Sequence, residues 1–213
     1  IDLVLQYDFI YTAEIDGDKF PNGVVINAPI RIDGNGTTIS GNNSYRIFDI
    51  IADVELTNIT FVNGSAGDNG GAILIENAIV KVADSVFENN YASNNRNSIY
   101  LNNGVLYLEN NTINKDYAEI VNNAGIIASN INVTVLEGNK SIPVRFNQTV
   151  TFNATVRDDN GNLIYDPNFN FTVDGKTVKA IPGYEIYTAE YTIAHAGETE
   201  IGMLYVANNI DVE

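Results

Sequence analysis

The sequence contains no cysteine, no tryptophan, a single histidine and only 11 Lys and Arg against 27 Asp and Glu. Without cysteine the chain forms no disulfide, holds no thiolate-bound metal and performs no thiol catalysis. The net charge of −16 argues against nucleic acid and an anionic membrane surface as partners, because both attract clustered basic side chains. The acidic surface is interpreted mainly as a solubilising one.

Long apolar runs and leader segments are missing as well. No run approaches the ~18 residues of a membrane span, so we expect no membrane insertion by this fragment. No signal peptide is recognisable, and a chain that begins at Ile1 is read as an excised mature fragment.

Asparagine, by contrast, is far above its usual share, and Leu-rich helical periodicity is missing, which predicts an all-β chain rich in turns. Ten asparagines begin an Asn-x-Ser/Thr triplet, the acceptor for N-glycosylation. Their density is compatible with an exported glycoprotein at the cell surface. The ten are Asn35, Asn42, Asn58, Asn63, Asn110, Asn132, Asn139, Asn147, Asn153 and Asn170.

A repeat of 26 residues organises the first part of the chain. Val54, Leu56 and Phe61 recur as Val80, Val82 and Phe87, and again as Leu106, Leu108 and Ile113. Apolar residues alternate within each short run, which is the period of a strand with one buried face. Units this short cannot bury their inner faces alone, so we predict stacking into a short right-handed parallel β-helix.

Asn77 and Asn103 recur at equivalent positions of this repeat, with Asp53 and Asn123 at similar ones. Asparagine tolerates the left-handed backbone that corners require, and its amide can bond the amide one coil away. About five coils are expected between residues 23 and 135, and the first twenty residues are expected to cap the open end.

Near residues 137–140 the repeat stops and the predicted strands lengthen. Residues 150–156, 169–173, 186–193 and 200–206 alternate as strands, with turn signals between them. This spacing favours an immunoglobulin-like β-sandwich. We therefore predict a β-helix with its cap at 1–136 and an Ig-like β-sandwich at 137–213.

Two resemblances carry the functional expectation. The segments Gly70-Gly71-Ala72-Ile73 and Phe87-Glu88-Asn89-Asn90 resemble the GGA(I/L/V) and FxxN motifs of polymorphic outer-membrane proteins, which are surface β-helix adhesins. The order of residues 30–41, 56–61 and 70–73 resembles the adhesin-like proteins of methanogenic archaea, and residues 142–206 resemble their Ig repeats. Together these stretches cover most of the chain.

The resemblance implies a monomeric, non-enzymatic, extracellular adhesin fragment without cofactor, which binds a surface glycan or protein of another cell. A carbohydrate-active β-helix enzyme, either a polysaccharide lyase or a hydrolase, is one alternative, and a ligand-free structural stalk is another. Aromatic rings stack on sugars and amides bond hydroxyls, so the ligand-binding candidates are four tyrosines and the loop at 92–97. The tyrosines are Tyr91, Tyr100, Tyr107 and Tyr117.

An enzyme of this kind requires paired carboxylates or a base with a cationic partner. Six acidic residues of the β-helix are candidates, but none forms a recognisable cluster, so no catalytic residue is assigned: Asp49, Asp53, Glu55, Asp84, Glu88 and Glu109. His195 is expected to be a surface histidine without a catalytic partner.

Two covalent or metal alternatives remain open in the second domain. Asp158, Asn160 and Asn162 are spaced like the start of a calcium loop, but the glycine is misplaced, so a hairpin turn is preferred and no metal is assigned. Lys176 and Lys179 are candidates for an amide crosslink to an asparagine, without a spacing that selects a pair.

Overall fold

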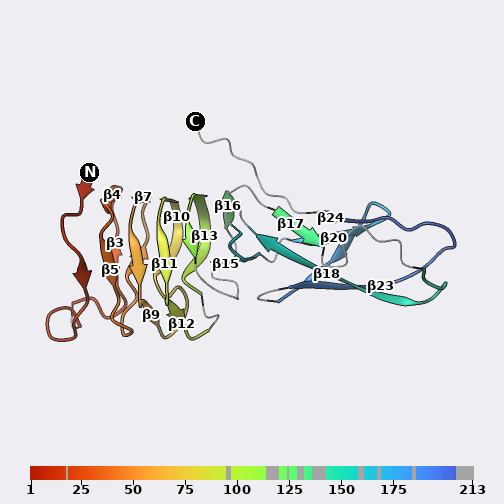
Figure 1. Ribbon diagram of the computed structural model, residues 1–213, viewed down its shortest axis with the longest axis horizontal. Helices are drawn as coiled ribbons and strands as arrows, with labels where there is room; N and C mark the ends of the chain where they lie inside the picture. The colour runs from red at the N-terminus through yellow and green to blue at the C-terminus, as the bar shows by residue number, and fades with distance from the viewer. Residues whose placement is uncertain are drawn as a thin grey trace.

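The computed structural model describes residues 1–17, 19–94, 97–113, 120–123, 125–128, 132–135, 143–157, 161–166, 169–183 and 186–204. Within these ranges every regular element is a β-strand, and none of them is a helix that could cross a membrane. The N-terminal part is a parallel β-solenoid of about 4 turns, and the C-terminal part contains antiparallel sheets (Figure 1). The predicted all-β class and the parallel β-helix are thus confirmed.

The solenoid wall is formed by parallel strands that stack from one turn, or coil, to the next. The largest sheet has two rows, which merge because β10 (Ile73–Ala83) and β13 (Ile99–Glu109) are long enough to join both. The first row also contains β3 (Val24–Ile26), β6 (Phe48–Ile50), β15 (Ile120–Asn122) and β19 (Ile164–Tyr165). The second row also contains β1 (Asp2–Val4), β4 (Ile30–Asp33), β7 (Val54–Thr57) and β16 (Ile126–Ala128).

Two smaller parallel sheets contain the other strands of the solenoid wall. One consists of β2 (Phe9–Ile10), β5 (Thr38–Ser40), β8 (Thr60–Val62), β11 (Val86–Glu88) and β14 (Thr112–Ile113). The other pairs β9 (Ser65–Ala66) with β12 (Tyr91–Ala92).

The predicted 26-residue register is confirmed residue by residue. Val80 pairs with Val54 on one side and with Leu106 on the other, and Phe87 lies between Phe61 and Ile113. The rings of Phe61 and Phe87 stack with centroids 4.7 Å apart. Because each inward column contains large apolar side chains in successive coils, stacking buries what a single coil would leave exposed.

The corners between strands explain why the chain is rich in asparagine. Asn58, Asp84 and Asn110 occupy one corner column with φ between 49° and 54°, and Asn63 and Asn89 occupy another with φ of 51° and 55°. This left-handed region is costly for most L-residues, and asparagine and aspartate tolerate it better.

A third column interrupts the two long strands themselves, as the repeat predicts. Asn77 and Asn103 have φ of 55° and 66°, and the Asn103 Nδ2 donates to the Asn77 Oδ1 over 2.8 Å. At the similar positions, Asp53 accepts from the Ile79 backbone N–H over 2.9 Å. Asn123 bonds Asn102 rather than Asn103.

A second set of asparagines points inward and closes gaps between coils. Asn90, with no exposed surface, accepts from the Gly64 N–H over 2.8 Å and donates to the Phe61 carbonyl over 3.0 Å. Gly64 stands 26 residues before Asn90, where a Cβ would lie 2.8 Å from the Asn90 Oδ1. The FxxN motif is therefore a core motif, in which Phe87 packs in the interior and Asn90 hydrogen-bonds backbone groups of the preceding coil.

The first ten residues add a partial coil. β1 pairs in parallel with β4, and β2 pairs in parallel with β5. Leu3 and Phe9 remain 43% and 48% exposed, and no described strand pairs with the outer edge of β1. The strands of this segment therefore continue the stack, and the role of the first twenty residues as a cap stays a prediction.

The C-terminal part contains two antiparallel sheets. One consists of β17 (Asn132–Val135), β18 (Thr149–Arg157), β23 (Tyr187–Thr192) and β22 (Ile181–Pro182). The other consists of β21 (Lys176–Lys179), β20 (Asn170–Val173) and β24 (Ile201–Leu204). Ring contacts connect the two sheets, since Phe152 of β18 lies 6.0 Å from Phe171 of β20.

One segment of the C-terminal part joins the solenoid. Ile164 and Tyr165 of β19 pair in parallel with Ile120 and Val121 of β15, so that this strand forms the last member of the first row. The solenoid thus ends after about four turns, where about five were expected, because the chain leaves it and returns only at β19. The predicted boundary at residues 136 and 137 lies outside the described residues.

Hydrogen bonds and packing hold this junction. The Asn162 Oδ1 accepts from the Ile113 N–H, and the Asn162 Nδ2 donates to the Asn111 carbonyl, each over 3.0 Å. Asp166, 3% exposed, accepts from the Asn122 Nδ2 over 3.0 Å. The Tyr187 hydroxyl, in β23, donates to the Ile164 carbonyl over 3.1 Å. These contacts tie the last coil to the antiparallel sheets.

Candidate ligand-binding groove

The outer surface of the second row presents side chains of different chemistry at equivalent positions of successive coils. Arg31 pairs in register with Glu55, Glu55 with Lys81, and Lys81 with Tyr107. These four residues form a line that runs across four coils, roughly along the solenoid axis. Because neighbouring parallel strands lie about 4.8 Å apart, the line spans about 14 Å.

A shallow groove of about 460 Å³ follows this line. Arg31, Glu55, Lys81 and Tyr107 line it together with a second, parallel line of residues that includes Asp53 and Ile79. Ile79 is 49% exposed, so the groove contains an apolar surface beside its polar groups. We call this set of residues the outer groove.

Two ion pairs involve the basic residues of the outer groove. The Arg31 Nε lies 3.0 Å from a Glu55 carboxylate oxygen, and the Lys81 Nζ lies 3.2 Å from a Glu109 carboxylate oxygen. The Arg31 side chain is 73% exposed, which leaves most of its guanidinium in solvent. The groove therefore offers paired donors and acceptors, and the carboxylates of Asp2 and Asp53, which also line it, add negative charge.

A larger cavity of about 520 Å³ lies inside the first coil. Its lining is mainly apolar and includes the core residues Leu5, Ile26 and Ile39. It contains few groups that would orient a ligand, and it continues the solenoid interior. The outer groove is the better candidate.

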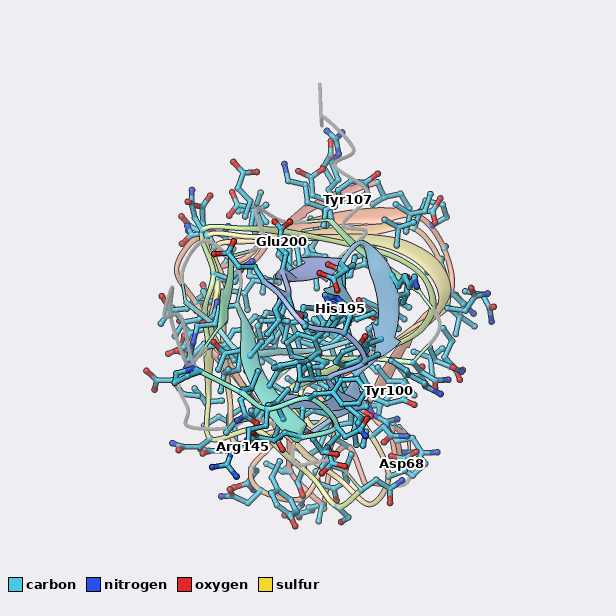
Figure 2. The ribbon with its side chains drawn as sticks, turned by 90° about the vertical axis from the view of Figure 1, so that its right-hand side faces the viewer. Asp68, Tyr100, Tyr107, Arg145, His195 and Glu200 are labelled. Atoms are coloured by element: carbon cyan, nitrogen blue, oxygen red, sulfur yellow. The ribbon has the colours of Figure 1, made fainter. Side chains whose placement is uncertain are left out.

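The four predicted sugar-stacking tyrosines do not form one site. Tyr107 belongs to the outer groove, whereas Tyr100 extends from the first row; Figure 2, viewed along the long axis, places them on different sides of the coil. Tyr91 is in β12 and is 45% exposed, and Tyr117 lies outside the described residues.

The predicted polar loop at 92–97 is only partly exposed. Ala92 and Asn97 have no exposed surface. The Asn97 Oδ1 accepts from the Gly70 N–H over 2.6 Å, so this residue supports the preceding coil. Ser93 and Asn94 are exposed, and residues 95 and 96 lie outside the described residues.

The six acidic candidates are distributed over several faces. Asp53 and Glu55 line the outer groove, and Glu109 joins it through Lys81. Asp84 lies at a left-handed corner, where it accepts from the Asn110 Nδ2, and Glu88 is exposed at the end of β11. Asp84 and Glu109 lie on adjacent coils one residue out of register, because Glu109 stands opposite Ala83, and the Asp84 N–H donates to the Glu109 carbonyl over 3.0 Å.

Asp49 differs electrostatically from the other acidic candidates. It points outward from β6 in the first row, and burial raises the pKa of its carboxyl, with the nearby charges of Glu76 and Asp68 adding to the shift and that of Arg46 opposing it. A carboxyl with a raised pKa beside other acidic residues is a feature of acid–base sites as well as of crowded structural ones.

His195 is exposed, as predicted, but it has a partner. Its Nε2 lies 2.8 Å from an Asp174 carboxylate oxygen, and the other Asp174 oxygen accepts from the Glu200 N–H over 2.9 Å. The hydrogen bond from His195 lowers the pKa of Asp174, and the same bond raises the pKa of His195. The pair ties two surface turns together, so His195 has a structural partner that the sequence analysis does not identify.

The calcium and crosslink alternatives receive little support from the described residues. Asn162 uses both side-chain polar atoms to bind the last coil, and Asp158 and Asn160 lie outside the described ranges. Lys176 and Lys179 are both exposed on β21.

The glycosylation candidates lie mostly at exposed positions. Asn35, Asn42, Asn58, Asn110 and Asn147 are exposed with left-handed φ, and Asn63 shares that φ but is half-buried. Asn153 and Asn170 are half-buried in β18 and β20, Asn132 is in β17, and Asn139 lies outside the described residues.

The fold supplies a reason for some of these triplets that does not involve glycans. For Asn58, Asn63 and Asn110, the Ser or Thr of the triplet is the first residue of the next strand. A left-handed corner favours asparagine, and the start of a strand accommodates Thr or Ser, so the solenoid geometry itself favours Asn-x-Ser/Thr.

Sequence reasoning does not identify two groove residues, Arg31 and Lys81, because no local cluster of basic residues marks them. The 26-residue register contains the signal, since Glu55, Lys81 and Tyr107 are successive members of one column.

Comparison with known proteins finds no matching protein-family model, no similar curated protein and no similar solved structure.

Proposed function

We propose that this chain is a non-enzymatic fragment of an exported, glycosylated cell-surface adhesin that acts as a monomer. It attaches to a surface glycan or protein of another cell, and the outer groove is its contact surface. The proposal follows the resemblance of its motifs to the adhesin-like proteins of methanogenic archaea.

The outer groove is the observation that carries this proposal. It combines an aromatic ring, an exposed aliphatic side chain and paired ionic groups on a wall of hydrogen-bonded strands. Such a surface binds amphipathic ligands, because rings stack on apolar faces while charged groups bond hydroxyls. A rigid wall also reduces the entropy lost on binding.

The finer architecture belongs to the same proposal. The solenoid is right-handed, and the C-terminal sheets form an immunoglobulin-like β-sandwich that spaces the groove from its anchor. Two antiparallel sheets joined by the contact of Phe152 with Phe171 are consistent with a sandwich core.

The test is incubation of the fragment with an array of microbial and host polysaccharides and surface proteins. Retained protein and released oligosaccharide are measured in the same wells. Retention without release supports the adhesin and identifies the ligand class. If neither retained protein nor released oligosaccharide is detected, the result contradicts the adhesin and favours a ligand-free stalk.

A carbohydrate-active enzyme is the second candidate, favoured by one observation. Asp49 and Glu76 interact on the outer face of the first row, and burial keeps the pKa of Asp49 raised. Glycoside hydrolysis requires two carboxyl groups, and the one that acts as general acid has a raised pKa. Release of sugar by the wild type and its loss in Asp49→Asn would establish this function instead.

A further inference from the structure

We propose that the outer groove binds a linear, uncharged oligosaccharide whose chain runs along the solenoid axis, with one sugar unit over each coil. This inference rests on the proposed function and specifies its ligand class and direction. It is independent of whether the glycan comes from a cell wall or from a glycoprotein.

The spacing of the coils sets the direction. Four consecutive coils present Arg31, Glu55, Lys81 and Tyr107 in direct register. Successive coils are separated by about 4.8 Å, which is close to the length that one pyranose unit adds to an extended chain. A chain along this line meets a polar group or a ring at every unit, whereas a chain across it soon leaves the groove.

The charge pattern disfavours an anionic ligand and leaves groups that hydrogen-bond sugar hydroxyls. Both basic groups of the line already have acidic partners, Arg31 with Glu55 and Lys81 with Glu109. A polyanion would have to displace these carboxylates on a chain of net charge −16, and it would also meet the acidic side chains of Asp2 and Asp53 in the same groove. Sugar hydroxyls both donate and accept, so they bond the outer sides of the ion pairs without separating them.

The groove has two different ends. Tyr107 supplies a ring at one end, beside the aliphatic Ile79, and this pair suits the apolar face of a pyranose. Arg31, three coils away, supplies exposed donors near the other end, where Asp2 is its register partner. The Tyr107 end therefore anchors a chain of any length, and the Arg31 end contacts only chains long enough to reach it.

The experiment is a length series. Cello-oligosaccharides and chito-oligosaccharides of two to six units are titrated into the whole fragment by isothermal calorimetry. We expect affinity to rise with each unit up to about four, the number of coils in the line, and then to level off. The series is repeated with Tyr107→Ala, Tyr107→Phe and Arg31→Ala, and with Lys179→Ala as a matched control, since Lys179 is exposed on β21.

Tyr107→Ala is expected to lower affinity at every length by about tenfold, while Tyr107→Phe keeps the ring and most of the affinity. Arg31→Ala is expected to lower affinity severalfold for four units and to leave two units unchanged. Binding that is independent of length, or equally reduced by Arg31→Ala at all lengths, overturns the axial arrangement but leaves glycan binding intact. If neither series binds but a charged polysaccharide or a surface protein does, the uncharged ligand class is wrong.

Discussion

The junction between the solenoid and the C-terminal sheets leads to a quantitative prediction for Asn162→Ala. Asn162 is 7% exposed and satisfies the Ile113 N–H and the Asn111 carbonyl. Alanine leaves both backbone groups without this partner in a buried place, and each such loss costs about 1–3 kcal/mol. Allowing for partial access of water, we expect a loss of about 3 kcal/mol in the free energy of unfolding.

The assay combines urea denaturation, followed by circular dichroism, with hydrogen exchange measured by mass spectrometry. Because Tyr187 of β23 binds the Ile164 carbonyl, the loss of protection should spread from β14 and β19 into the antiparallel sheet. Asn94→Ala, at an exposed loop position, is the control and should leave both measurements unchanged. An Asn162→Ala protein with wild-type stability and wild-type protection of β14 refutes the reasoning that this amide closes the last coil.

Three further predictions concern the corners, the core and the surface pair. Asn103→Ala should destabilise the fold by about 1–2 kcal/mol, because φ at this position is 66°. Asn103→Gly should lose less stability, because glycine tolerates that φ. Thermal denaturation of both variants checks this. Gly64→Ala should lower the free energy of unfolding by about 1–3 kcal/mol, because its Cβ would collide with the Gly71 carbonyl oxygen. A lowered urea midpoint is the expected result, and an unchanged midpoint contradicts the close packing of the coils. The NMR titration of His195 should show a pKa above 6.5 that returns to its usual range in Asp174→Asn. In the wild type, His195 stabilises the folded state below its unfolded pKa, and this stabilisation is lost as pH rises through its raised folded pKa. Asp174 stabilises the folded state above its unfolded pKa, and this stabilisation is lost as pH falls through its lowered folded pKa.

The solenoid is predictable from sequence because its contacts repeat. Pairing Val54 with Val80 and Val80 with Leu106 requires only a constant offset, and every inward column provides an independent check of that offset. The left-handed corners are predictable for the same reason, since asparagine recurs where the backbone requires it.

The contacts that the sequence analysis misses lack such a repeat. β19 follows its partner β15 by 44 residues, after the chain has formed part of another sheet, so no periodic pattern marks it. The pairing of His195 with Asp174 depends on how β20 and β24 align, which local patterns do not determine. In the groove, Arg31 stands 24 residues before Glu55 rather than 26, so a strict period misplaces it.

The most direct test of the adhesin proposal is the binding of fragment-coated beads to microbial cells, with groove variants compared on the same cells. We expect beads that carry the wild type or Lys179→Ala to bind, and beads that carry Tyr107→Ala or Lys81→Ala to lose most of that binding. Equal binding by all four proteins would contradict the assignment of the outer groove as the adhesive surface.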